Sequence, residues 1–196
     1  LLLICLWLPL QASAQLVIEI TQGIDNPTAM AVSPFSWAGH DRLPEDVASI
    51  IDANLARTGL FNMLQRSQML SFPDTQQNVH YRDWRALGRE YLLIGRMVPV
   101  GDRVEVRYQL FDIVRQTTLL SYQMTASRNG LRDLAHKISD QVFEKITNIP
   151  GAFSTKMLYV SGRNLGNGKH NYQLFIADAD GARERRVLNS DEPIMS

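Results

Sequence analysis

Residues 44–59 read PEDVASIIDANLARTG and contain a full set of signals for one amphipathic helix. Proline suits the first turn of a helix, acidic residues suit its positive end, and Gly59 can adopt the left-handed conformation that ends it. The apolar residues Val47, Ile50, Ile51 and Leu55 recur at helical spacing. We therefore predict a helix from Pro44 to Thr58 with one buried stripe, and we expect Asn54 at the edge of that stripe, where its amide reaches water.

The segments around this helix predict a sheet and a second long helix. Leu131, Leu134, Ile138, Val142 and Ile146 fall on one face of a predicted helix over residues 131–147, ended by Pro150 and Gly151. A short helix is predicted over 83–87, and strands are predicted over 29–32, 91–98, 103–114 and 118–126. Residues 103–110 alternate polar and apolar side chains, which is typical of a half-exposed sheet. We expect one α/β domain over residues 27–150, with two main helices on a mixed, mostly antiparallel sheet.

After Gly151 the sequence predicts strands only. We expect strands over 156–161, 172–177 and 186–188, separated by turn-rich pieces at 162–164 and 178–181. A meander of this kind has one apolar face with little to cover it, and such units are stable when they stack into propellers or solenoids. We therefore interpret residues 151–196 as an incomplete repeat unit whose neighbours lie further along the protein.

The first residues, LLLICLWLPLQASA, resemble part of a secretory signal peptide. The apolar run up to Leu10 is half the roughly 20 residues that a membrane-spanning helix needs, and Ala12-Ser13-Ala14 matches an A-x-A cleavage site. We expect residues 1–14 to be removed, which leaves Gln15 at the new N-terminus of an exported chain. Cys5 leaves open a lipoprotein interpretation, but large apolar residues precede it where small ones are expected.

Charge and cysteine content limit the classes of function. Twenty basic and twenty acidic residues give a net charge of zero, which argues against neutralisation of nucleic-acid phosphates and against a polybasic membrane patch. The one cysteine lies in the predicted signal peptide, so the mature chain has no disulfide. The classes of function that remain are binding of a protein partner, binding of a small ligand and action on a neutral substrate.

Motifs for catalysis, metals and phosphates are weak. The histidines at positions 40, 80, 136 and 170 form no metal-binding spacing, and we expect His136 to be a surface residue. Asp178-Ala179-Asp180-Gly181 resembles the start of a calcium loop, but a tight turn is favoured because position twelve is Asn189 and arginines follow. Residues 162–169, GRNLGNGK, are expected to form a hairpin loop, because a phosphate loop needs a helix N-terminus. The aromatic and basic run 81–85 could stack on bases, but we expect Trp84 in the core. No catalytic residue, cofactor or metal ligand is assigned.

Nine segments along the chain resemble motifs of a known family, the TolB proteins of the Tol-Pal cell-envelope system of Gram-negative bacteria. They are 32–39 (VSPFSWAG), 44–46 (PED), 55–61 (LARTGLF), 84–88 (WRALG), 108–112 (YQLFD), 139–147 (SDQVFEKIT), 151–155 (GAFST), 176–181 (IADADG) and 190–196 (SDEPIMS). Thr58 stands where the family has serine. The segment 190–196 resembles the sequence that precedes a WSPDG repeat in the family, and this chain ends there.

The resemblance implies a domain similar to the anticodon-binding domains of class II tRNA synthetases, joined to a six-bladed β-propeller. Residues 151–196 would then be the incomplete first blade. It also implies a non-catalytic protein of the periplasm whose N-terminal peptide binds the C-terminal domain of TolA. The propeller would bind the lipoprotein Pal, so that the protein maintains outer-membrane integrity and constriction at cell division. It implies membrane association only through these partners, and the Pal-binding residues are not assigned.

Residues 15–26 are the expected partner-binding peptide. Their β-branched side chains favour an extended conformation, and Leu16, Ile18 and Ile20 share one face. The residues themselves leave open an ordinary edge strand, or a strand added to the sheet of a partner; the resemblance favours the partner. The predicted TolA-binding residues are Leu16, Val17, Ile18, Glu19, Ile20, Thr21, Gln22 and Gly23.

Two other functional classes stay open on the sequence. An exported α/β domain could bind a small ligand or hydrolyse a substrate in a crevice of its sheet, although this rests on fold analogy alone. The similarity to anticodon-binding domains also allows an RNA-binding domain, which export and neutral charge oppose.

Overall fold

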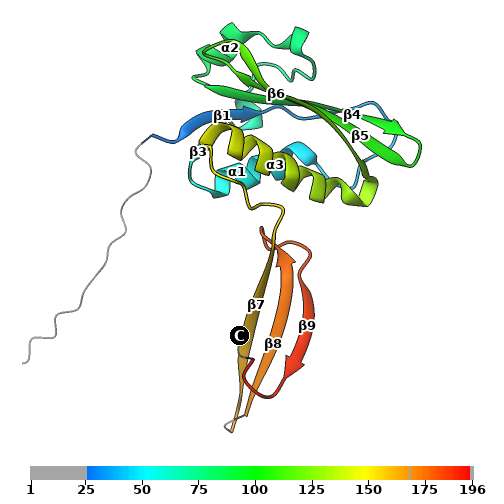
Figure 1. The fold of residues 1–196 in the computed structure, drawn as a ribbon, viewed down its shortest axis with the longest axis vertical. Coiled ribbons are helices and arrows are strands. Elements are labelled where there is room, and N and C mark those ends of the chain that lie inside the picture. The colour runs from blue at the N-terminus through cyan, green and yellow to red at the C-terminus, as the bar shows by residue number, and fades with distance from the viewer. Residues whose placement is uncertain (1–25, 168, 195–196) are drawn as a thin grey trace, which may run out of the picture.

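The computed structural model describes residues 26–167 and 169–194, which form an α/β domain followed by a three-stranded antiparallel unit (Figure 1). The helices of the domain are α1 (Val47–Arg57), α2 (Tyr81–Ala86) and α3 (Leu131–Thr147), with 3-10 turns at Arg66–Gln68, Gln76–Asn78 and Arg128–Gly130. Its strands are β1 (Thr28–Val32), β2 (Ser36–Trp37), β3 (Phe61–Met63), β4 (Tyr91–Val100), β5 (Arg103–Asp112) and β6 (Thr117–Ser127). The second unit contains β7 (Lys156–Gly166), β8 (Lys169–Asp178) and β9 (Arg185–Ser190).

The sheet of the domain is mixed. Its strands are ordered β3-β1-β4-β5-β6, and β2 pairs with β4 beside this path. The long pairs β4–β5 and β5–β6 are antiparallel, as predicted, whereas β1–β3, β1–β4 and β2–β4 are parallel. The sheet is therefore mixed and mostly antiparallel, as predicted. The sequence pattern missed β2 and β3 because strands of two and three residues show no periodicity.

Helices cover both faces of this sheet (Figure 1). On one face α1 and α3 pack on a core that contains Ile51, Leu93 and Ile138. On the other face α2 and the segment before it cover a smaller core around Trp84 and Phe111. Trp84 is 1% exposed, which confirms its predicted place in the core.

The ends of two predicted helices differ from the observed ones. The helix predicted from Pro44 begins at Val47, because Asp46 caps it by accepting a hydrogen bond from the Ser49 N–H at 3.0 Å. The short helix predicted over 83–87 covers Tyr81–Ala86 instead. The second long helix, α3, matches its predicted bounds and ends at Asn148 in the left-handed conformation.

The second unit contains longer strands than predicted. Strand β7 continues to Gly166, so the turn predicted at 162–164 is wrong; the chain turns after it, next to Asn167. Residues 162–166 pair with β8, so most of the predicted hairpin loop belongs to the hairpin strands themselves. This unit extends away from the helices α1 and α3, as Figure 1 shows.

Candidate functional site: the terminal peptide and the domain junction

The predicted partner-binding residues 16–23 lie outside the described residues. The chain can be followed from Asn26 into β1, which pairs with β3 on one side and β4 on the other. The Thr28 N–H donates to the Leu60 carbonyl at 2.9 Å, so the first strand is held from its first residue. Residues 15–26 are therefore attached directly to a fixed point inside the sheet.

A short linker holds the second unit against helix α3. Asp140 of α3 accepts hydrogen bonds from the backbone N–H groups of Phe153 at 2.7 Å and Ser154 at 3.2 Å. Phe153 packs edge-on against Phe143, with their ring centroids 5.6 Å apart. A side chain at Gly151 would bring its Cβ within 2.5 Å of the Asp140 Cα, so this close approach requires glycine. The linker is thus fixed to the helix by both hydrogen bonds and packing.

A cluster of charged side chains joins α3 to the turn after β8. Asp178 accepts hydrogen bonds from Arg183 Nε at 2.7 Å, from Arg132 Nε at 3.3 Å and from Lys156. Arg132 also binds Asp180 and lies 3.7 Å from a carboxylate oxygen of Glu45. These contacts connect α3 with the first residue of β7, Lys156, and with the last residue of β8, Asp178.

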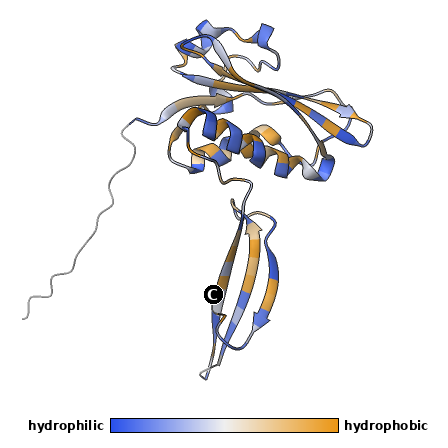
Figure 2. Ribbon diagram, viewed as in Figure 1, coloured by the Kyte–Doolittle hydropathy of each residue, from blue (hydrophilic) through white to orange (hydrophobic). Residues whose placement is uncertain are grey.

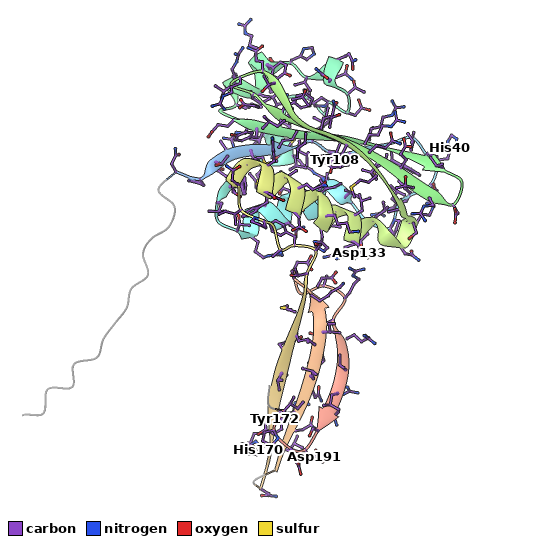
Figure 3. The ribbon with its side chains drawn as sticks, viewed as in Figure 1. His40, Tyr108, Asp133, His170, Tyr172 and Asp191 are labelled. Carbon is purple, nitrogen blue, oxygen red and sulfur yellow. The ribbon has the colours of Figure 1, made fainter. Side chains whose placement is uncertain are left out.

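The same cluster has a fourth carboxylate and fixes the charge state of Asp178. Arg183 pairs with Asp133, which Figure 3 places at the end of the domain nearest the second unit. Burial raises the pKa of the Asp178 carboxyl, but the hydrogen bonds from Arg183 and Lys156 outweigh it and bring that pKa to about 2. The pKa of the Arg183 guanidinium is raised by its bonds to the two carboxylates. Asp178 is therefore a carboxylate at neutral pH.

Beneath this cluster lies a buried polar triad that the sequence analysis placed wrongly. Asn54 was expected at the surface edge of its helix and His136 on the surface, yet they are 1% and 2% exposed. Asn54 Nδ2 lies 2.9 Å from His136 Nδ1 and 2.9 Å from Ser139 Oγ. Both residues are buried because α1 and α3 pack face to face, and each satisfies polar atoms of the other.

The hydrogen bonds of the triad determine the tautomer of His136. Asn54 Oδ1 accepts from Arg57 at 3.3 Å, and Ser139 Oγ donates to the Ala135 carbonyl at 2.9 Å. Asn54 Nδ2 is therefore the donor to both neighbours, and His136 Nδ1 must be the acceptor. It follows that the proton of the neutral ring is on Nε2. Burial lowers the pKa of His136, so the ring is neutral at pH 7.

His136, Asp178 and Asp180 offer three possible metal ligands whose atoms lie within 4.8 Å of one another. His136 Nε2 has no hydrogen-bond partner and lies 3.7 Å and 3.8 Å from the two carboxylates. However, that nitrogen carries the proton, so it has no lone pair to give a cation. The cationic side chains of Arg132, Lys156 and Arg183 also bind these carboxylates. The arrangement fits a charge-neutralised turn and does not fit a metal ion.

The turn itself was predicted, but its partners were not. The Gly181 N–H donates to the Asp178 carbonyl at 2.9 Å, which confirms the tight turn at 178–181. Its contacts with Arg132 and His136, about 45 residues earlier in the chain, depend on how two units meet. The polar residues at buried positions of the helix stripes, Asn54, His136 and Ser139, were the available signal for a buried site.

None of the helices in the described part of the chain has the length and apolar character needed to cross a bilayer. Comparison with known proteins gives a consistent family. A family model for the TolB amino-terminal domain matches residues 16–119. The chain is 40% identical over its whole length to the Tol-Pal system protein TolB of Pseudomonas fluorescens Pf-5 and 44% identical to that of Thioalkalivibrio sulfidiphilus.

The chain spans 45% of the length of each of these curated relatives. Among solved structures, the crystal structure of TolB from Acinetobacter baumannii matches with a TM-score of 0.75 and 30% identity, over 91% of this chain and 42% of that one. This match supports the observed fold, a two-helix domain on a mixed sheet followed by strands that suit the start of a propeller. The chain belongs to the TolB family of Tol-Pal system proteins.

Proposed function

We propose that this protein is a non-catalytic interaction protein of the periplasm that links TolA of the inner-membrane complex to the outer-membrane lipoprotein Pal. In this role it would maintain envelope integrity and support outer-membrane constriction during cell division. Membership of the TolB family carries the proposal. Contact with Pal is assigned to the propeller, and contact with TolA to the peptide of residues 15–26.

The attachment of that peptide supports its proposed role. Strand β1 lies between two other strands and begins at Thr28, so the residues before it start from a rigid position. A peptide so attached can add a strand to the sheet of TolA while β1 keeps its own pairing in the domain. Its backbone would supply the hydrogen bonds, and the face formed by Leu16, Ile18 and Ile20 would supply apolar contacts.

The chemistry of the described residues supports a role without catalysis. The buried histidine next to carboxylates is a natural candidate for acid–base chemistry. Here His136 Nδ1 accepts from Asn54, and Asp178 binds three cations. These groups bind one another and so hold the helix to the turn, which is consistent with a protein that acts by binding partners.

Binding to the C-terminal domain of TolA tests the proposal. Immobilised TolA domain should retain the chain of residues 15–196 and lose most of a chain that starts at residue 27. Ile18→Asp should abolish retention, because it places a charge on the apolar face, whereas Ile18→Val keeps an apolar β-branched side chain there and is the matched control that should retain binding. Undiminished binding of the chain that lacks residues 15–26 would contradict the site. Saturable small-molecule binding by residues 27–150 would instead favour a ligand-binding domain.

A further inference from the structure

The imidazole ring of His136 lies where the two regions of the molecule meet. Its Nδ1 is 2.9 Å from Asn54 Nδ2 of α1, and its Nε2 is 3.7 Å from a carboxylate oxygen of Asp178 at the end of β8. The ring is 2% exposed, yet an imidazole in water takes up a proton at about pH 6.5. One proton on this ring therefore affects two contacts, that of α3 with α1 and that of α3 with the second unit.

On the α1 side, the neutral ring is an obligatory acceptor. The Asn54 amide donates to Nδ1 and to Ser139 Oγ, and Ser139 donates to the Ala135 carbonyl. A further proton binds at Nδ1 and places two N–H groups face to face, which leaves a buried donor without an acceptor. Turning the amide over would point its N–H group at Arg57, which donates to Asn54 Oδ1 at 3.3 Å. The charged ring therefore does not fit this arrangement of α1 and α3.

On the side of the second unit, the charges next to the ring are already paired. They come from the residue before α1, from α3, from the ends of β7 and β8 and from the turn after β8: Glu45, Arg132, Asp133, Lys156, Asp178, Asp180 and Arg183. The two carboxylate oxygens nearest to Nε2, at 3.7 Å and 3.8 Å, both bind Arg132, and Nε2 makes no hydrogen bond. Arg132 is also one helical turn before the ring on α3, where like charges repel.

The linker provides a pivot for the second unit. The chain enters this unit through residues 151–154, where Asp140 of α3 binds the backbone N–H groups of Phe153 and Ser154. The buried residues of the unit, Ala177 and Asp178, lie at the end next to α3. If the contacts of the charged turn with α3 are lost, the unit can turn about the linker as a rigid body.

We propose that His136 and the turn at 178–183 form a proton-controlled latch between the α/β domain and the second unit. In the latched arrangement the ring is neutral and the turn lies against α3. In the released arrangement the ring is charged and meets water, and the unit has turned about the linker. The latch requires neither TolA nor Pal, so it goes beyond the proposed function.

The direction of the change follows from which arrangement binds the proton better. Burial is the largest cause that lowers the pKa of His136 in the latched arrangement, and Arg132 and Arg183 lower it further, while Asp180 and Asp178 oppose them. Release exposes the ring and removes the burial. The ratio of released to latched protein should therefore rise by up to about tenfold for each pH unit below about pH 6.5.

Distances between spin labels test the latch. The labels are carried by Arg85→Cys on α2 and Arg163→Cys on β7, both exposed positions, in the chain of residues 15–196, which has no other cysteine. We expect one distance distribution at about pH 7.5 and a second one that grows toward about pH 5, as the His136 ring signal titrates in NMR spectra. A single distribution throughout, while the ring titrates, would overturn the proposal.

Two substitutions at the ring show whether its proton is responsible. His136→Asn cannot take up a proton and should keep the first distribution at every pH, whereas His80→Asn, at an exposed position, is the matched control and should behave as the original chain. Asn54→Asp offers Nδ1 a carboxylate, so the ring should be charged and the second distribution present already at about pH 7.5. A second distribution that grows equally in His136→Asn, or a charged ring in Asn54→Asp with the first distribution alone, would contradict the latch. Either variant decides the matter if the other does not fold.

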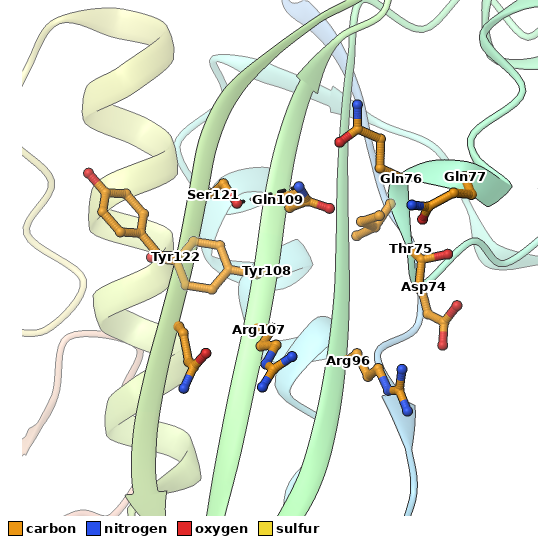
Figure 4. A pocket seen from close by; sticks show the side chains of 12 residues that line it. Asp74, Thr75, Gln76, Gln77, Arg96, Arg107, Tyr108, Gln109, Ser121 and Tyr122 are labelled. Atoms are coloured by element: carbon orange, nitrogen blue, oxygen red, sulfur yellow. Dashed lines mark hydrogen bonds between the residues drawn. The ribbon is translucent and has the colours of Figure 1, made fainter.

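A third substitution tests the charged turn. Arg132→Gln removes the side chain that binds both Asp178 and Asp180, so the second distribution should be present at neutral pH. Arg96→Gln is the matched control, because Arg96 lines a separate polar groove of about 420 Å³ on the domain sheet, shown in Figure 4. This control should keep the first distribution at neutral pH. If Arg132→Gln also kept the first distribution alone, the turn would not hold the unit and the proposal would fail.

Discussion

The longest strands of the α/β domain and of the three-stranded unit are of similar length, but the two regions bury their side chains to very different extents. In the domain, helices cover both faces of the sheet, and Leu93 is 0% exposed. In the unit, Leu158 is 63% exposed and Leu188 47% exposed, and only Ala177 and Asp178 are buried among its described residues. Figure 2 shows apolar residues along the strands of both regions. Regular backbone pairing therefore does not make a core unless another element covers the face.

The position of the two buried residues explains how the unit is held. Both lie at the end of β8 next to α3, where Asp178 meets Arg132 and the linker is bonded to Asp140. The domain is stabilised by burial of apolar surface, whereas the unit is joined to it chiefly by charge pairs and a short linker. The two regions should thus respond differently to mutation, to pH and to salt.

The largest expected difference is between two leucine-to-alanine substitutions. Leu93→Ala removes a fully buried side chain and should lower the free energy of unfolding by about 2–5 kcal/mol. Leu158→Ala removes a side chain that is 63% exposed and should cost less than about 1 kcal/mol. Urea denaturation followed by circular dichroism measures both. Equal losses would show that the face of the unit is covered in solution and would remove the contrast between the two regions.

A smaller effect is expected from acid, and it should arise at the junction. The pKa of His136 is lowered first by burial and further by Arg132 and Arg183, while Asp180 and Asp178 oppose the shift. The unfolded chain therefore takes up a proton below about pH 6.5 that the folded chain does not. The free energy of unfolding should therefore fall by up to about 1.4 kcal/mol per pH unit in this window, down to the lowered pKa of the folded ring.

Asp178 acts in a separate and more acidic window. The pKa of Asp178 in the folded chain, about 2, lies below its ordinary value of 3.8. Its contribution to the free energy of unfolding is therefore present above pH 4 and is lost as the pH falls toward 2. This loss amounts to about 2 kcal/mol. The change can be followed by urea denaturation at a series of pH values.

Substitution separates the two acid effects. His136→Asn keeps an acceptor oxygen for Asn54 but cannot titrate. The free energy of unfolding should therefore depend less on pH between pH 7 and pH 5, while its decrease below pH 4 remains. His80→Asn, at an exposed position, is the matched control and should keep both. If the free energy of unfolding of His136→Asn still fell between pH 7 and pH 5, another group would be responsible for that loss.

The same contrast explains what the sequence could predict. Residues that pack within one element follow a local pattern, so the bounds of α3 and the buried place of Trp84 were predicted. Asn54 and His136 were misplaced because their burial depends on the contact between α1 and α3, which lie about 80 residues apart in the chain. The partners of Asp178 were missed for the same reason: the residues that bind it come from α3, β7 and the turn itself.

The smallest expected effect belongs to an ion pair on the surface of the domain. Arg66 binds both carboxylate oxygens of Asp46, at 2.9 Å and 3.0 Å, but the two side chains are 43% and 51% exposed. Water and salt screen such a pair, so Arg66→Gln should lower the free energy of unfolding by only about 0.5 kcal/mol. This loss should disappear in 1 M salt, where the screening length is about 3 Å.

Arg132→Gln is the comparison for this pair, because its side chain is 16% exposed and it binds two carboxylates at the junction. Without it, Asp178 and Asp180 lose a bound cation in a place with little access to water, so the loss of stability should be larger and should persist in 1 M salt. Urea denaturation at low and high salt gives both values. If the two variants lost the same free energy and both recovered in salt, the junction would be an ordinary surface contact, and the unit would be free to move relative to the domain. A persistent loss in Arg132→Gln alone would mean that the charges at the junction hold the two regions in one arrangement.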